Sequence, residues 1–163
     1  MINSFFITKE LNISNINEYI ISASVHDLRR INDKEDKGHG KRASDWFIEN
    51  ESIFLNFLSN ANTSQFNNIV ESVAFHDIDY ESIPKHIYES HMLAIDIIKA
   101  ADALDRYIQP KEKWWPNTNY IKIKESHKLL SICRKITLDS ERLILQGMHP
   151  EEAIFTIVYN LKA

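Results

Sequence analysis

The 163 residues of the chain, 44% of them hydrophobic, are enough for one compact domain with a core and too few for two. The formal net charge is -4, and 19 basic residues are interleaved with 23 acidic ones, so no block of positive charge indicates a nucleic-acid-binding or membrane-surface protein. No apolar stretch approaches the ~20 residues of a membrane-spanning helix, no N-terminal segment resembles a secretory signal, and Cys133 is the single cysteine. We therefore expect a soluble, cytoplasmic protein that binds neither a membrane nor nucleic acid.

The low content of turn residues, three Gly and four Pro, favours helices over many short strands. Residues 1–15 are expected to form a short irregular lead, and residues 109–120, polar and containing tryptophan, a long connection. Outside these two segments the hydrophobic spacing predicts about six helices, over residues 16–30, 40–58, 64–76, 86–108, 124–146 and 150–161. The prediction is a single all-α domain that spans residues 1–163.

The first and last helices carry the clearest local signals. Ile16, Tyr19 and Ala23 recur three or four residues apart, as on a helix that buries one face, and His26 continues this stripe. The last helix is expected to begin at Pro150, because proline suits the first helical position and the acidic residues that follow face the positive end of the helix.

Two His-Asp pairs, His26-Asp27 and His76-Asp77, offer an imidazole next to a carboxylate, a donor set that suits first-row divalent metals. Neighbouring residues on a helix point ~100° apart, yet at a helix end that faces a cleft both can reach one ion. Either pair, taken alone, also fits a solvated helix end on the surface. The spacing by itself does not decide which pair, if any, binds a metal.

The first pair belongs to a set of three segments that follow one another in the chain: ASVHDLRRIND at residues 23–33, GHGKRAS at 38–44 and IIKAADALDR at 97–106. Together these segments resemble the HD superfamily of metal-dependent phosphohydrolases. The resemblance covers roughly residues 20–142, including a later ESHKLL segment at 125–130 that is similar to one found in some bacterial members.

The resemblance implies an all-helical fold and a site for one or two divalent ions. By position in the motifs, His26 and Asp27 are the metal-binding pair and Asp102 is the second carboxylate ligand. His39 and His76 correspond to the additional histidines of members with two metals. Asp77 then becomes a bystander or an acceptor behind a ligand. The mixed donor set accepts Mn, Fe, Ni, Zn or Mg and does not name the metal.

The implied activity is hydrolysis of a nucleotide or of another small phosphate ester or diester. Asp27, Arg30 and Arg106 are the candidate catalytic residues, because a planar guanidinium can bind two phosphate oxygens at once. The other cations near the motifs are Arg29, Lys41 and Arg42, and the other acids are Asp33 and Asp105. Charged side chains beside helix ends more often cap carbonyls or stay solvated than bind substrate.

One departure from the family pattern is that no histidine precedes His26, whereas members usually have one about 25 residues upstream. Water, another side chain or a second subunit replaces this ligand, or the protein is a degenerate relative that binds a metal, a nucleotide or a protein without turnover. A shortened N-terminus would also leave Tyr19 and Ile20 exposed, which predicts a homodimer that covers them.

The other histidines, two of the tryptophans and the cysteine are expected to lie outside the metal site. His91 is three helical turns, or ~16 Å, from Asp102. The others have simple structural explanations: surface or capping positions for His86, His127 and His149, a lid over the core for Trp114 and Trp115, and a buried apolar position for Cys133.

Overall fold

The computed structural model describes residues 1–32, 36–54, 57, 62–107 and 115–161, and in these ranges the protein is helical without a strand. This confirms the predicted all-α class. Three short 3-10 turns, at Tyr80–Ser82, Thr118–Tyr120 and Lys124–Leu129, accompany eight α-helices. The α-helices are α1 (Ile2–Glu10), α2 (Asn17–Val25), α3 (His39–Glu49), α4 (Glu51–Phe54), α5 (Thr63–Ala74), α6 (Lys85–Leu104), α7 (Leu130–Leu145) and α8 (Pro150–Asn160). None of the helices in the described ranges is long and apolar enough to cross a membrane.

Residues 2–10 form a helix, so the predicted irregular lead over residues 1–15 is wrong. The buried side of α1 carries polar residues as well as Ile7, and an apolar stripe is therefore missing from its sequence. Two of these polar groups are satisfied locally, since the Ser4 hydroxyl donates to the Met1 carbonyl at 2.7 Å and the Thr8 hydroxyl to the Phe5 carbonyl at 2.8 Å. Hydroxyls satisfied within their own helix can be buried at little cost.

Helix α1 also covers the surface that the sequence predicted to be bare. Tyr19 is only 5% exposed and belongs to the same core cluster as Ile7. Tyr19 is therefore not bare as predicted, whereas Ile20 is half-buried, and the homodimer stays a prediction.

Helix α2 is buried on two sides, and this determines where its end lies. Tyr19 and Ala23 pack into a core cluster formed with α1 and α6, whereas Ile21 and Val25 pack into a second cluster formed with α3 and α5. The C-terminal end of α2 therefore lies between these two sets of helices. Residues that follow Val25 are held where α3, α5 and α6 can reach them.

Most of the other predicted helices are present, but their ends differ from the predicted ones. The helix expected over 40–58 breaks at Asn50, whose side-chain amide donates to the Trp46 carbonyl at 2.8 Å, and α4 follows. The helix expected over 124–146 begins as the 3-10 turn Lys124–Leu129. Pro150 is the first residue of α8, as predicted. Residues 55, 56, 58 and 108, and residues 109–114 of the expected connection, lie outside the described ranges.

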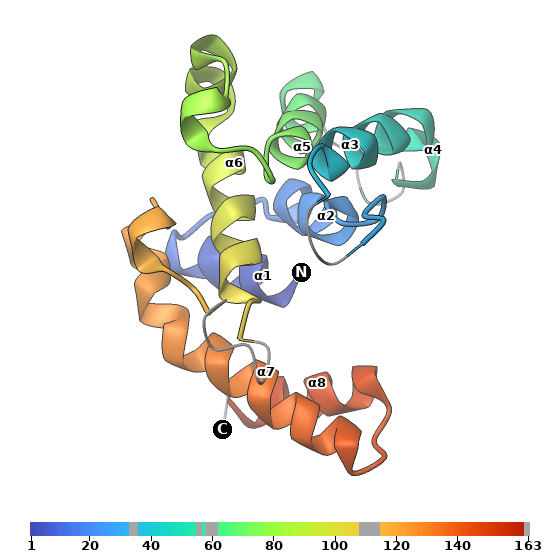
Figure 1. Ribbon diagram of the computed structural model, residues 1–163, viewed down its shortest axis with the longest axis vertical. Coiled ribbons are helices and arrows are strands. Elements are labelled where there is room, and N and C mark those ends of the chain that lie inside the picture. Colours follow the sequence, from blue (N-terminus) through green and yellow to red (C-terminus); the bar gives the residue numbers. More distant parts are fainter. Residues whose placement is uncertain (33–35, 55–56, 58–61, 108–114, 162–163) are drawn as a thin grey trace.

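The helices divide into two groups along the molecule. Figure 1 shows α2, α3, α4 and α5 on one side of α6 at one end, and the α7–α8 hairpin at the opposite end. Helix α6 contacts α1, α2, α5 and α7 and so connects the two groups. The residues that the sequence marks for metal binding all belong to the group around α2, α3, α5 and α6.

Candidate metal centre

Three histidines and an aspartate from separate parts of the chain meet at helix ends. His26 and Asp27 directly follow α2, His39 is the first residue of α3, and His76 lies two residues beyond α5. The chain turns at residues 26–29 instead of continuing the predicted helix to Arg30. This early end lets the neighbouring His26 and Asp27 side chains approach the same spot.

Three of these residues form a group that could hold a metal ion, because one ligand atom each from His26, Asp27 and His76 lie within 4.8 Å of one another. His39 lies next to this group, with its Nε2 2.9 Å from Asp27 Oδ1 and 2.9 Å from His76 Nε2. Asp102 Oδ1, from α6, lies 4.0 Å from His26 Nε2. We call these five residues the metal cluster: His26, Asp27, His39, His76 and Asp102.

All three imidazole rings are oriented in the same way, by a contact between Nδ1 and a backbone carbonyl. Each Nδ1 contacts the carbonyl three residues earlier: His26 with Ala23 at 3.0 Å, His39 with Asp36 at 2.7 Å, and His76 with Val73 at 2.8 Å. Because a carbonyl only accepts, each Nδ1 carries the proton and donates it. In the neutral ring Nε2 is then the acceptor, and the contacts of the cluster are made through Nε2.

This arrangement brings the acceptor atoms of two histidines and one aspartate close together. In the neutral tautomer described above, the Nε2 atoms of His39 and His76, which lie 2.9 Å apart, are both acceptors, so neither donates to the other. Asp27 Oδ1 is buried beside them and accepts no hydrogen bond from the described residues. Donor atoms each ~2.1 Å from one ion and at right angles to each other lie ~3.0 Å apart. The observed spacings therefore fit ligands of one small cation.

The directions in which the pKa values of His26 and Asp27 are shifted also suit a metal. Burial lowers the pKa of His26, and the neighbouring His76 lowers it further, against the attraction of Asp27 and Asp102. Burial alone would raise the pKa of Asp27, but His76, His26 and Arg30 together hold that pKa well below its usual value. Neutral imidazole and ionised carboxylate are the forms that bind metals.

Solvent can reach one side of the cluster. The His76 side chain is 2% exposed and forms the closed end, whereas the Asp27 side chain is 37% exposed. Arg30 Nη1 lies 3.2 Å from Asp27 Oδ2, and Arg106 Nη2 donates to Asp102 Oδ2 at 2.5 Å. Both predicted phosphate-binding arginines thus lie at the open side, each paired with a carboxylate of the cluster.

Three of the remaining charged candidates from the sequence, Lys41, Arg42 and Asp105, are engaged elsewhere. Lys41 pairs with Asp45, and Arg42 pairs with Asp36 and donates to the Arg29 carbonyl. Asp105 accepts from the Asn3 amide at 3.4 Å, and burial raises the pKa of its carboxyl. Asp33 lies outside the described ranges.

Most of the other histidines, and Cys133, lie where the sequence predicted. His91 is absent from the cluster and its Nδ1 contacts Asn68 Oδ1 at 2.8 Å. Surface positions are confirmed for His86 and His149, which are exposed, whereas His127 is half-buried, with its Nε2 3.4 Å from the Ile121 carbonyl. Burial raises the pKa of the Cys133 thiol to about 12, as for a residue with a packing role.

Trp115 packs against the core, and its ring meets the Tyr107 ring edge to face, with centroids 5.4 Å apart. This fits the predicted lid over the core, whereas Trp114 lies outside the described ranges.

Sequence reasoning missed two residues that shape the cluster. Lys99 donates to the carbonyls of His76, at 3.1 Å, and Ile78, and so holds the end of α5 against α6. Its position three residues before Asp102, on the same face of α6, was the available signal. Asp36 holds His39 through its carbonyl and accepts from the Ile31 amide at 2.6 Å, and no motif distinguishes it.

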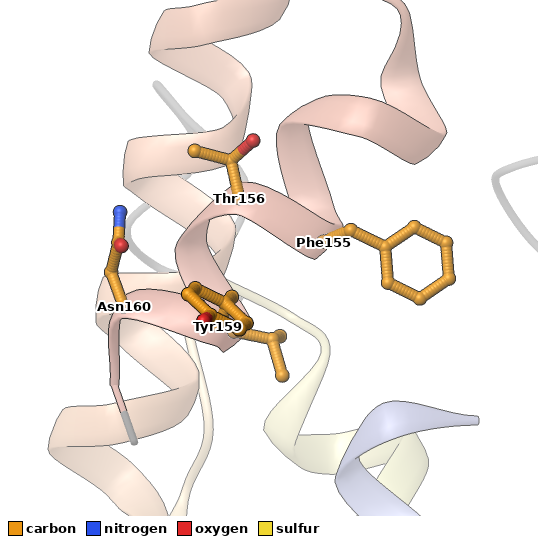
Figure 2. A pocket seen from close by; sticks show the side chains of 5 residues that line it. Phe155, Thr156, Tyr159 and Asn160 are labelled. Atoms are coloured by element: carbon orange, nitrogen blue, oxygen red, sulfur yellow. The ribbon is translucent and has the colours of Figure 1, made fainter. Parts of the chain in front are cut away.

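A hollow on α8 is the other candidate for ligand binding. Phe155, Thr156, Val158, Tyr159 and Asn160 line it (Figure 2). Its lining has no imidazole, carboxylate or cationic side chain, and α8 lies at the opposite end of the molecule from α3 (Figure 1). The chemistry that the sequence predicted is therefore concentrated in the metal cluster.

Comparisons with known proteins neither support nor contradict the resemblance to the HD superfamily. No family model matches the chain, and no curated protein or solved structure gives a significant match. Membership of that superfamily remains a prediction from the sequence motifs.

Proposed function

We propose that this protein is a metal-dependent phosphohydrolase of the HD type, acting on a nucleotide or on another small phosphate ester or diester. One observation carries the proposal. His39 Nε2 and His76 Nε2 face each other at 2.9 Å beside Asp27 Oδ1, which accepts no hydrogen bond from the described residues. Buried acceptors that face one another are unfavourable unless a cation lies between them.

Four residues, His26, Asp27, His39 and His76, would hold the ion, and Asp102 would complete its surroundings. When bound, a divalent ion supplies Lewis acidity, which makes hydroxide available near neutral pH and offsets negative charge on a phosphoryl group. Its identity among Mn, Fe, Ni, Zn and Mg is left open by the mixed donor set.

The protein's own side chains account for substrate binding at the open side. Arg30 and Arg106 are positioned to bind phosphate oxygens through two N–H groups each. Asp27 Oδ2 lies on this side with Arg30, and its lowered pKa keeps it an acceptor that can orient an attacking water. The absence of a basic block elsewhere favours a small substrate over a nucleic acid.

A second candidate function is a metal-, nucleotide- or protein-binding module without turnover. It is favoured by α1, which precedes the His-Asp pair but contains no histidine. From α1 the Asn3 amide reaches Asp105, at 3.4 Å, and the Ala101 carbonyl, at 3.3 Å. A metal with fewer protein ligands still binds, but with water in more positions.

Elemental analysis of protein purified without chelator tests the metal, and a screen of nucleotides and phosphate esters with Mn, Ni and Mg tests the reaction. We expect stoichiometric metal and turnover of at least one ester. Arg30→Gln and Arg106→Gln should raise KM while metal content is retained, whereas Arg142→Gln on α7 serves as the matched control.

The outcomes separate the two candidates. Bound metal without turnover of any ester would favour the binding module. Absence of bound metal, together with no turnover after metal is added, would exclude the phosphohydrolase.

A further inference from the structure

His39 differs from His26 and His76 because a carboxylate lies on the Nδ1 side of its ring. Its Nδ1, which donates to the Asp36 carbonyl, also lies 3.2 Å from Asp77 Oδ2. The Asp77 side chain is 7% exposed, and the same Oδ2 accepts the Gly38 amide at 2.9 Å. A buried carboxylate thus contacts both the imidazole and the residue before it.

A carboxylate behind an imidazole has two effects on a metal ligand. It fixes the orientation and tautomer of the ring, and it makes the opposite nitrogen a stronger donor. Asp77 contacts the Nδ1 side of His39, whereas Asp27 and His76 contact the Nε2 side. Asp77 can therefore act on the cluster through His39 without contacting an ion itself.

We propose that Asp77 is a positioning residue of the metal centre, which aims His39 Nε2 at Asp27 and His76. This role rests on the proposed metal-binding function. Asp77 directly follows His76 in the chain, so one short turn provides both a ligand and the group that orients another ligand. The second His-Asp pair thereby has a role distinct from that of the first.

The packing of α3 on the end of α5 supports this role. A Cβ added at Gly40 would lie 2.7 Å from Asp77 Oδ1 and 2.8 Å from His76 Nδ1. Glycine at this position therefore allows the first turn of α3 to approach both residues. The close approach keeps Asp77 in contact with Gly38 and His39.

Titration with Co²⁺ tests the proposal, because the visible spectrum of bound Co²⁺ reports the ligand geometry. The variants are Asp77→Asn, Asp77→Ala and the control Asp79→Asn, which removes an exposed carboxylate two residues away. We expect Asp77→Ala to weaken binding by about 10- to 100-fold with an altered spectrum. Asp77→Asn, which can still accept the Gly38 amide, should lie between Asp77→Ala and wild type.

Unfolding of each variant in chelator separates positioning from general stability. A loss of Co²⁺ affinity much larger than the change in unfolding midpoint supports positioning, and the nearly isosteric Asp77→Asn provides the test if Asp77→Ala does not fold. Wild-type affinity and spectrum in both Asp77 variants would overturn the role of Asp77 alone. Wild-type protein that binds no Co²⁺ would overturn the metal site and, with it, this role.

Discussion

Two clusters of polar side chains include residues of α6, and they differ in how a carboxylate is paired. The second cluster, here called the tyrosine cluster, consists of Tyr80, Tyr88, Asp96 and Lys122. The Tyr88 hydroxyl lies 3.0 Å from both oxygens of Asp96 and accepts from Lys122 Nζ at 3.0 Å. Lys122 Nζ also lies 3.6 Å from the centre of the Tyr80 ring. The carboxylate of Asp96 thus accepts a hydrogen bond from the Tyr88 hydroxyl, and this hydroxyl in turn accepts one from the Lys122 ammonium group.

The metal cluster has no such built-in cation at its centre. Its arginines bind the outer oxygens of Asp27 and Asp102, while Asp27 Oδ1 and the Nε2 atoms of His39 and His76 face one another. Buried polar groups are stable when every acceptor has a donor. In the tyrosine cluster the carboxylate of Asp96 has a hydrogen-bond donor, although the buried Tyr80 hydroxyl has no hydrogen-bond partner among the described residues. In the metal cluster it is the carboxylate atom Asp27 Oδ1 that has none, and the metal that we propose would supply its partner.

Asp27→Ala should have the largest effect on the metal cluster, because it removes the carboxylate that contacts all three histidines. We expect metal affinity to fall about 100-fold, or ~2.8 kcal/mol. At saturating metal this loss equals a decrease of roughly 6–11 °C in the metal-induced rise of Tm for a chain of this size. Calorimetric titration and thermal unfolding with Mn²⁺ measure both quantities.

Asp96→Asn is the matched control for Asp27→Ala, since it removes the carboxylate charge of the tyrosine cluster. It should leave metal affinity at the wild-type value. Equal losses of affinity in the two variants would contradict the distinction between the clusters.

Gly40→Ala should disturb the metal cluster through its packing. The added Cβ would lie 2.6 Å from the Val73 carbonyl, which is backbone, so α3 must move away from α5. We expect a loss of ~1–3 kcal/mol in unfolding free energy, measured in chelator by urea titration, together with weaker metal binding. Gly147→Ala is the control, because its φ of +96° strains alanine although no atom lies within 4 Å. If both variants bind metal as wild type does, the geometry of the cluster does not depend on Gly40.

The residues of the metal cluster could be picked out from the sequence because histidine and aspartate are side chains that can bind metals. The resemblance to the HD motifs pointed to His26, His39 and His76, and the structure brings these three together although they lie far apart in the chain. Asp102 lies beside them, at 4.0 Å from His26. The role of Asp77 was left open, since spacing cannot tell which side of a neighbouring imidazole a carboxylate will contact.

Other features could not be predicted, for identifiable physical reasons. Helix α1 buries Asn3, Ser4 and Thr8, so its sequence lacks the apolar periodicity that indicates a helix. The tyrosine cluster joins Lys122, which follows the long connection, to Tyr88 on α6. Contacts between residues so far apart depend on tertiary packing and carry no local signal.

Lys122→Met tests the tyrosine cluster, because it removes the cation of that cluster. The hydrogen bond to Tyr88 and the contact with the Tyr80 ring disappear, and the unfolding free energy should fall by ~1 kcal/mol. Lys124→Met, at an exposed position two residues on, should have a smaller effect. Urea titration with and without metal measures both, and a metal-dependent effect of Lys122→Met would mean that the two clusters are coupled.

The smallest expected effect is a pH dependence of stability that belongs to the tyrosine cluster alone. Burial raises the pKa of Asp96 above its ordinary value of 3.8, and the tyrosine hydroxyls and Lys122 offset this only in part. Below pH 3.8 the carboxyl is protonated in both folded and unfolded chains. As the pH rises from there through the raised pKa, the unfolded chain loses the proton first, so ionisation destabilises the folded state.

Asp96→Asn has no group that titrates at this position, so its stability relative to wild type should increase from pH 4 to pH 7. Urea titrations of both proteins in chelator across this range measure the difference, and chelator removes any contribution from metal binding. Parallel stability curves would show that Asp96 titrates alike in the folded and unfolded chains. The tyrosine hydroxyls and Lys122 would then compensate fully for the burial of its charge.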